Sequence, residues 1–350
     1  MIISRTPFRI SFFGGGTDYP VWFQEHGGAV LATSINKYCY ISCRYLPPFF
    51  EHRSRIVWSK VETVRDVADI EHPAVRETLK LLEISQGIEL HHDGDLPART
   101  GLGSSSAFTV GLLHALYGLK GIMPSRLQLA RDAISVEHDL LREQVGCQDQ
   151  VIAAFGGFNR IDFVSQGEFL VSPVILSESR LALLQDHLML FFTGFCRNAS
   201  EIAAEQTKAT KHKAKELQLM QRMVDEALGM LQGTDDLGAF GELLHGTWQL
   251  KRSLTEKVST LEIDEMYKTA RRAGAIGGKL LGAGGGGFLL LFVRPEEQGR
   301  VKVALQHLLH VPFRFESGGS RIIFYDPDGA VEETGFLSGV PDSAVPNIST

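Results

Sequence analysis

Three consecutive serines follow a glycine pair in the segment Pro97–Ala107, whose sequence is Pro-Ala-Arg-Thr-Gly-Leu-Gly-Ser-Ser-Ser-Ala. Glycines let the backbone approach a ligand closely, and the serines begin an apolar helix whose first N–H groups have no partner within the helix. Phosphate is the natural ligand of such a helix start. An N-cap after a turn is the alternative, but three serines exceed what a cap requires. The predicted contacts are Pro97, Gly101, Leu102, Gly103, Ser104, Ser105 and Ser106.

Two further glycine patterns resemble nucleotide-binding motifs only in part. No Gly-Lys-Ser or Gly-Lys-Thr occurs, and the nearest match, Gly278-Lys279, is followed by Leu280. A Walker A loop is therefore excluded. The run Gly282–Gly287 satisfies Gly-x-Gly-x-x-Gly, but it precedes the strand-like segment Phe288–Val293 instead of opening a helix. A dinucleotide site is therefore a poor interpretation, and we predict a loop that lines a cleft between two lobes.

Glu137 lies in the apolar stripe of a predicted helix over 125–143. Leu127, Ala130, Ile134 and Leu141 recur around it at steps of three and four. A buried carboxylate needs a cationic partner. The partner could be an arginine in a structural salt bridge, but Mg²⁺ is favoured because hard oxygen ligands suit it.

Asp149, Arg9 and Asp18 are the other candidates for chemistry. Asp149 follows a glycine-containing turn and precedes an apolar run, so a simple N-cap is its alternative role. Arg9 faces away from the apolar side of its strand, and Asp18 ends the glycine turn after that strand. An arginine beside a carboxylate holds the carboxylate ionised and oriented, which suits a base that accepts a hydroxyl proton.

The elements that position these residues alternate between strands and helices. This alternation predicts an α+β protein in two lobes, with the boundary between 156 and 186. The assigned domains are 1–180, 181–330 and a tail over 331–350. Predicted strands cover 8–12, 29–35, 37–44, 56–58, 90–92, 158–163, 187–192, 288–293, 313–315 and 321–325. Predicted helices cover 72–86, 105–119, 125–143, a segment starting near 149, 201–231, 237–254, 262–273 and 296–309.

Composition excludes several classes of protein. The chain has 350 residues, 44% of them hydrophobic, and a formal charge of −6, which argues against general binding to nucleic acid or anionic membranes. Its four cysteines have no metal-binding spacing. We find no signal peptide and no apolar run of the roughly 18 residues that a membrane span needs. A cytoplasmic location is therefore expected.

Together these segments resemble the superfamily of galactokinase, homoserine kinase, mevalonate kinase and phosphomevalonate kinase. Its three motifs are matched in order by Pro7–Asp18, Pro97–Ala107 and Lys279–Gly287. The resemblance implies an ATP-dependent small-molecule kinase. It also implies an N-terminal domain like ribosomal protein S5 domain 2, a ferredoxin-like C-terminal domain and an active site between them.

Site residues follow from the resemblance by position. Ser105 and Glu137 are similar to the family's Mg²⁺ ligands, and 101–106 is similar to its phosphate loop. Asp149 is similar to the catalytic base, and Arg9 to the residue that orients it. ATP and Mg²⁺ are the implied cofactors.

The sugar that accepts the phosphoryl group is implied by a departure from the galactokinase pattern. That branch has Gly-Glu-His-Thr-Asp-Tyr where this chain has Gly-Gly-Gly-Thr-Asp-Tyr at 14–19, so its sugar-binding Glu and His are missing. The glycine version resembles the bacterial branch that phosphorylates the anomeric hydroxyl of D-glycero-D-manno-heptose 7-phosphate for nucleotide-heptose and cell-envelope glycan synthesis. A fucokinase- or galactokinase-like kinase, an ATP-using decarboxylase and a non-catalytic sugar sensor of the same fold stay open.

A sugar or sugar phosphate needs its own contacts, and an already phosphorylated one needs a second anion site. Arg99 and Lys37 are additional cationic candidates, and the oligomeric state is not predicted. The predicted substrate contacts are Gly15, Gly16, Thr17, Asp18, Arg197, Lys279, Gly284, Gly285 and Gly286.

Overall fold

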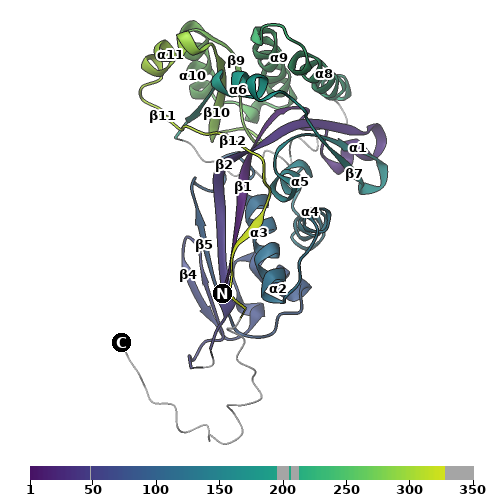
Figure 1. The fold of residues 1–350 in the computed structure, drawn as a ribbon, viewed down its shortest axis with the longest axis vertical. Coiled ribbons are helices and arrows are strands. Elements are labelled where there is room, and N and C mark those ends of the chain that lie inside the picture. The colour runs from purple at the N-terminus through teal and green to yellow at the C-terminus, as the bar shows by residue number, and fades with distance from the viewer. Residues whose placement is uncertain (48, 195–204, 206–212, 328–350) are drawn as a thin grey trace, which may run out of the picture.

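The computed structural model describes residues 1–47, 49–194, 205 and 213–327, and it has two lobes (Figure 1). The first lobe contains a nine-stranded sheet with the central order β13-β1-β2-β5-β3-β4, to which β6, β7 and β12 add through β2 and β6. Its strands are β1 (Ile2–Phe13), β2 (Gly28–Tyr45), β3 (Ser54–Val57), β4 (Val61–Val64), β5 (Ile88–Gly94), β6 (Phe158–Phe163), β7 (Phe169–Pro173), β12 (Phe315–Glu316) and β13 (Arg321–Tyr325).

A layer of helices covers one face of this sheet (Figure 1). The helix α3 is apolar around most of its circumference, and it is buried between β1 and β2 on one side and α4 and α5 on the other. The helices of this lobe are α1 (Pro20–His26), α2 (Pro73–Leu81), α3 (Ser104–Leu119), α4 (Arg126–Ser135), the π-helix η2 (Val136–Leu140) and α5 (Gln148–Phe155), with the 3₁₀ turns η1 (Val67–Asp69) and η3 (Ser165–Gly167).

The second lobe is a four-stranded antiparallel sheet in the order β11-β8-β10-β9 with helices packed around it. All six residues of β10 are buried, as its continuous apolar sequence requires. The strands are β8 (Leu188–Phe192), β9 (Ala275–Leu280), β10 (Phe288–Val293) and β11 (Leu309–His310). The helices are α6 (Glu178–Asp186), α8 (Ala214–Gln232), α9 (Gly238–Leu254), α10 (Leu261–Arg272), α11 (Gln298–Ala304) and the turns η5 (Glu256–Val258) and η6 (Pro295–Glu297).

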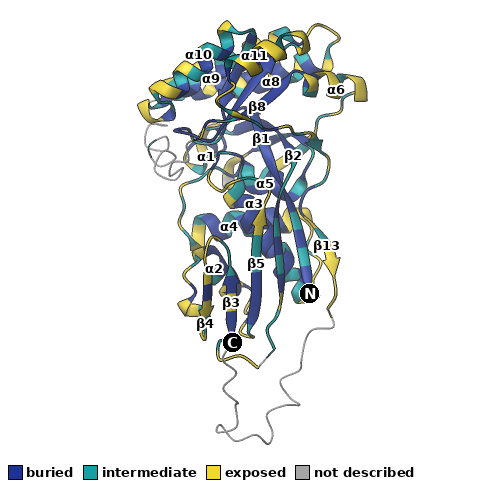
Figure 2. Cartoon of the chain, turned by 90° about the vertical axis from the view of Figure 1, so that its left-hand side faces the viewer, coloured by how far each residue is buried: buried dark blue, intermediate teal, exposed yellow. Residues whose placement is uncertain are grey.

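One hydrophobic core joins the lobes. Phe12 and Phe13 at the end of β1 pack their rings against Phe240 of α9, with centroids 5.8 and 5.1 Å apart. Buried residues run without a break from the large sheet into the second lobe, while the outer helices are exposed (Figure 2). The two lobes are therefore held in a fixed relation where the end of β1 meets α9.

The C-terminal strands correct the predicted domain boundaries. β12 pairs with β2 and β13 pairs with β1, so residues 315–325 complete the first lobe instead of the second. Short apolar segments show that strands exist but not which sheet they join, because pairing depends on distant residues. The start of the predicted helix 201–231 and the tail 331–350 fall outside the described residues.

Two local predictions change for identifiable reasons. The strands expected at 29–35 and 37–44 are one strand, β2, with a bulge: Ile35 lies opposite Phe8, while Tyr38 lies opposite Pro7. The helix expected over 125–143 ends at Ser135 and continues as the wider π-helix η2, which contains Glu137.

Sequence reasoning missed α1, α6, β4, β7 and β9. No helix in the described part of the chain has the length and apolar character that crossing a bilayer requires.

Candidate active site

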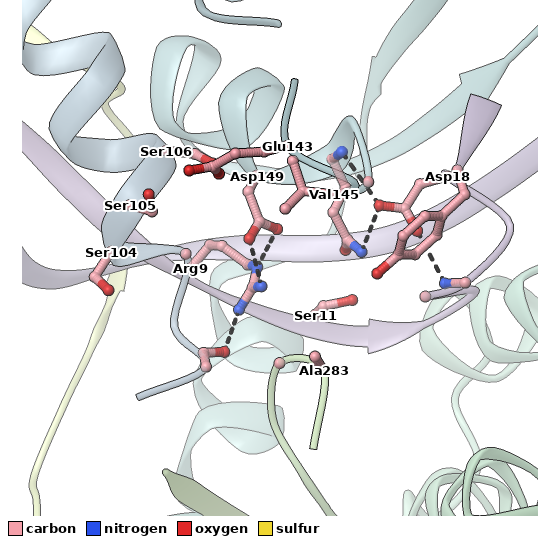
Figure 3. Close-up of a pocket in the computed structure, with 18 of the residues that line it drawn as sticks. Arg9, Ser11, Asp18, Ser104, Ser105, Ser106, Glu143, Val145, Asp149 and Ala283 are labelled. Atoms are coloured by element: carbon pink, nitrogen blue, oxygen red, sulfur yellow. Dashed lines mark hydrogen bonds and ion pairs between the residues drawn. The ribbon is translucent and has the colours of Figure 1, made fainter. Parts of the chain in front are cut away.

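A cavity of about 220 Å³ is lined by both lobes (Figure 3). The first lobe contributes the start of α3, the end of β1 with its glycine turn, the segment after η2 and the start of α5. The second lobe contributes the end of α9, β9 and the loop after β9. The three sequence motifs, which lie far apart along the chain, thus meet at one cavity.

The start of α3 offers unpaired N–H groups to this cavity. Gly103 adopts a left-handed backbone (φ 73°) and precedes Ser104, the first helical residue. The first helical hydrogen bond runs from the N–H of Ala107 to the carbonyl of Gly103, so the N–H groups of Ser104, Ser105 and Ser106 have no partner among the described residues. The arrangement suits an anion.

Glycine at 101 permits contact between the lobes. Its φ is 82°, and a Cβ there would lie 2.4 Å from the carbonyl oxygen of Leu281 in the second lobe. Pro97 and Leu102 do not line the cavity. Leu102 is fully buried, and its carbonyl accepts a hydrogen bond from the backbone N–H of Arg9, so its role is to fix the loop to β1.

Arg9 and Asp149 form a two-pronged ion pair in the cavity wall (Figure 3). The Nε and Nη2 atoms of Arg9 donate to the two carboxylate oxygens of Asp149, each at 2.7 Å, and Nη1 donates to the carbonyl of Gly101 at 2.6 Å. Asp149 retains 23% of its side-chain exposure. Its carboxylate is therefore fixed in direction yet open to the cavity, as a proton acceptor requires.

Glu137 is a buried carboxylate with one unpaired oxygen. Its Oε2 accepts hydrogen bonds from the hydroxyl of Ser106, at 3.0 Å, and the side-chain amide of Gln150, whereas Oε1 has no partner among the described residues. Burial, followed by the nearby charge of Glu143, raises the pKa of Glu137 to about 8. A bound cation would supply the missing partner and favour the charged form. The residues therefore fit Mg²⁺, which needs few protein ligands when phosphate oxygens supply others.

The three serines at the start of α3 have different surroundings. Ser106, not Ser105, hydrogen-bonds to Glu137. Ser105 is exposed at the cavity wall, and its hydroxyl makes no hydrogen bond to described residues. The Ser104 hydroxyl accepts from the N–H of Arg99 and so braces the loop.

Asp18 is buried at the other end of the cavity. Its carboxylate accepts from the N–H of Gly16 at 2.9 Å and from the side-chain amide of Gln148 at 2.9 Å. Burial raises the pKa of Asp18. Gly15, Gly16 and Asp18 line the cavity, but Thr17 does not, because its hydroxyl is occupied by the carbonyls of Gly14 and Ala29.

Only some of the substrate contacts predicted in the second lobe line the cavity. Gly284, Gly285 and Gly286 do not line the cavity, whereas Gly282 and Ala283 do. Gly284 packs against the backbone of Val258, which a Cβ would approach to 2.6 Å.

The predicted cationic contacts also differ in position. Lys279 lines the cavity, but its ammonium donates to the carbonyl of Phe12 at 2.9 Å and thereby ties β9 to β1. Arg99 is at the cavity wall and Lys37 is not. Arg197 lies outside the described residues.

Sequence reasoning missed Lys251 of α9. It follows Leu244 and Trp248 and precedes Leu254 at helical steps, so it interrupts an apolar stripe as Glu137 does. The same pattern, a charged residue within an apolar helical stripe, could have identified Lys251. Gln148, Gln150 and Glu143 carried no comparable signal, because amides and acids beside loops are common.

Comparison with known proteins agrees with the architecture. The GHMP kinases N terminal domain family matches residues 64–157, and the GHMP kinases C terminal family matches 227–310. A mevalonate kinase of Pyrococcus horikoshii is 30% identical over 67% of this chain and 69% of its own. D-glycero-alpha-D-manno-heptose 7-phosphate kinase of Campylobacter jejuni is 29% identical over 87% of this chain and 93% of its own.

Solved structures share the fold. A D-glycero-D-manno-heptose 1-phosphate kinase from Bacteroides thetaiotaomicron superimposes with a TM-score of 0.73 at 23% identity, covering 92% of this chain and 98% of the other. Lactococcus lactis galactokinase superimposes with a TM-score of 0.71 at 20% identity, over 91% and 94%. The chain belongs to the GHMP kinase family. It is an ATP-dependent kinase with that family's two-domain α+β fold.

Proposed function

We propose that this kinase transfers the γ-phosphoryl group of ATP to the anomeric hydroxyl of D-glycero-D-manno-heptose 7-phosphate, giving the 1,7-bisphosphate. The observation that carries this choice of sugar is the similarity to the Campylobacter jejuni heptose 7-phosphate kinase, which extends over 87% of this chain and 93% of the relative. The product belongs in nucleotide-heptose and cell-envelope glycan synthesis. An enzyme that consumes ATP for this purpose is expected in the cytoplasm.

In the proposed mechanism the phosphates of ATP lie on the N–H groups of Ser104, Ser105 and Ser106. Asp149 accepts the proton of the attacking hydroxyl, and Arg9 keeps the carboxylate directed at that hydroxyl. Positioning and charge neutralisation supply most of the acceleration, as in phosphoryl transfer generally. An anomeric hydroxyl is more acidic than an ordinary alcohol, which reduces the demand on the base.

Mg²⁺ would be held by Oε1 of Glu137 and by a serine hydroxyl at the start of α3. Ser105 has the free hydroxyl, whereas Ser106 already bonds to the same carboxylate. When bound, the ion supplies positive charge beside the phosphates of the nucleotide. The described residues contain no cluster of three acidic, His or Cys side chains, which agrees with an ion whose other ligands are phosphate and water.

The sugar lies between the glycine turn of Gly15, Gly16 and Asp18 and the second lobe. Asp18 accepts hydrogen bonds in the structure, so its carboxylate is aimed by Gly16 and Gln148 before a sugar enters. Arg197 and Lys279 stay candidates for the substrate phosphate.

A coupled ADP-release assay across heptose 7-phosphate, L-fucose, galactose and mannose phosphates tests the proposal. We expect heptose 7-phosphate to give the highest kcat/KM, with phosphate on the anomeric oxygen of the product by ³¹P NMR. L-Fucose is the second candidate, because the bifunctional fucokinase/GDP-fucose pyrophosphorylase of Arabidopsis thaliana is 23% identical over 84% of this chain, which spans 30% of that protein. Turnover of L-fucose alone would replace the heptose assignment, and absence of turnover with every sugar would favour a sensor.

A further inference from the structure

Two buried lysines stand in the second-lobe wall of the cavity. Lys251 of α9 is 8% exposed and Lys279 of β9 is 3% exposed. Neither forms an ion pair within the described residues. The ammonium of Lys279 donates to the carbonyl of Phe12, and the ammonium of Lys251 donates to the carbonyls of Gly282 and, at 3.4 Å, Leu280.

A buried ammonium without a counter-ion is costly to the folded protein, and backbone carbonyls compensate only part of that cost. An ammonium has three N–H groups, and the two carbonyls take two of those of Lys251. The remaining N–H and the positive charge are available to an anion that enters the cavity.

The loop that Lys251 holds lies against the phosphate loop. A Cβ on Gly282 would lie 2.3 Å from the Cα of Gly101, so the backbones at these two glycines touch. Lys251 also lies close enough to Arg9, Asp18 and Asp149 for its pKa to respond to their charges. Lys251 lines the same cavity as the start of α3 and Asp149, the space in which the proposed transfer takes place.

Arg9 is another cation in the cavity wall, but its guanidinium is already engaged in hydrogen bonds. Each of its three guanidinium nitrogens donates a hydrogen bond, two to Asp149 and one to Gly101. Arg9 thus balances the charge of the base. Lys251 has no carboxylate partner in the described chain, so its charge is free for the substrate.

We propose that Lys251 is a further catalytic residue whose ammonium stabilises the negative charge on the transferred phosphoryl group. The inference rests on the proposed phosphoryl transfer at this cavity. As the bond from the γ-phosphorus to the β,γ-bridging oxygen breaks, the bond to the sugar oxygen forms. The hydroxyl proton passes to Asp149 and ADP leaves, while Lys251 remains protonated throughout. The ammonium of Lys279 is engaged with the carbonyl of Phe12, which ties β9 to β1.

The test compares Lys251→Met and Lys251→Arg with Lys268→Met, an exposed lysine of α10. Removing one charged contact to a transition state costs roughly 10²–10³ in rate. We expect Lys251→Met to lower kcat by that factor while the KM values of ATP and sugar change less than about threefold. Lys251→Arg should recover at least tenfold of the loss. A kcat loss below about threefold in Lys251→Met, or a loss that Lys251→Arg does not recover, would overturn the proposal.

The pH profile provides a second readout. Burial, with a smaller effect of Arg9, lowers the pKa of Lys251 to about 8, while Asp18 and Asp149 oppose this shift. Lys279 is a further ionisable neighbour, and burial lowers its own pKa well below the usual range. The charged form is lost as pH rises, so kcat of the wild type should fall above about pH 8. Lys251→Arg keeps its charge and should not show that fall. An identical alkaline fall in both proteins would contradict the role of Lys251 even if Lys251→Met does not fold.

Assays of the wild type with different sugars separate the substrate assignment from the role of Lys251. If heptose 7-phosphate is not turned over but another sugar is, the same variants are measured with that sugar. The substrate assignment then fails while the role of Lys251 is still decided by kcat.

Discussion

Two carboxylates of the first-lobe wall, Asp149 and Glu137, lie in opposite environments. Asp149 has both oxygens engaged by one guanidinium and is still 23% exposed. Glu137 is 1% exposed, has one oxygen without a partner among the described residues, and has a pKa raised to about 8 by burial. Asp149 thus has its cation within the protein, whereas Glu137 has no ion-pair partner among the described residues and, in the proposed mechanism, receives Mg²⁺ with the nucleotide.

This difference explains how one cavity can hold a base and a metal ligand. A carboxylate whose charge is balanced by Arg9 does not compete for an incoming cation, so a metal ion is directed to Glu137. In the proposed mechanism, the cost of the unpaired Oε1 of Glu137 in the free protein is offset when Mg²⁺ binds with ATP. Four substitutions test this contrast.

The largest effect is expected for Asp149→Asn. The amide can keep a hydrogen bond to Arg9 but cannot accept the proton, so kcat should fall by roughly 10²–10⁴. Steady-state kinetics give the value, and nucleotide affinity by calorimetry should change little. Asp139→Asn, on the outer side of η2, is the control. A loss below about threefold would mean that the proton leaves by another route.

Glu137→Gln should change how stability depends on pH in the metal-free protein. The pKa of Glu137 is raised on folding, from 4.5 to about 8, so its favourable contribution is complete below about pH 4.5 and disappears as pH rises to about 8. Urea unfolding should therefore show wild-type stability declining across that range and a flatter curve for the variant. Mg²⁺ with a non-hydrolysable ATP analogue should stabilise the wild type more than the variant at pH 8. Equal stabilisation of the wild type and the variant by Mg²⁺ with the analogue would place Glu137 outside the metal site.

The smallest effects distinguish two neighbouring serines. Ser106→Ala removes a hydrogen bond from a buried carboxylate and should cost about 1 kcal/mol of stability, measured by urea unfolding. Ser105→Ala removes a hydroxyl with no hydrogen bond to described residues and should leave stability unchanged, but it should raise the Mg²⁺ concentration needed for half-maximal activity. The opposite pattern would exchange their roles.

The sequence by itself determined the chemical groups and most of the local elements. β6, β10 and β13 have the predicted bounds, because alternation or a continuous apolar run over five or six residues suffices to define a strand. The charged residue in an apolar stripe identified Glu137 as buried, because burial follows from helical periodicity. The glycine and serine spacing predicted a helix start at Ser105, one residue after Ser104, where α3 begins.

Only the tertiary structure decided which of these groups meet. Arg9 and Asp149 are 140 positions apart, and their ion pair depends on how β1 and α5 pack. Contacts between residues far apart in the sequence also decide three other features. These are the pairing of β12 and β13 with the first-lobe sheet, the hydrogen bond of Ser106 to Glu137 and the hydrogen bond of Lys251 to the carbonyl of Gly282. Local patterns encode which side of an element is buried, but not its neighbour, because neighbours are selected by the free energy of the whole packed core.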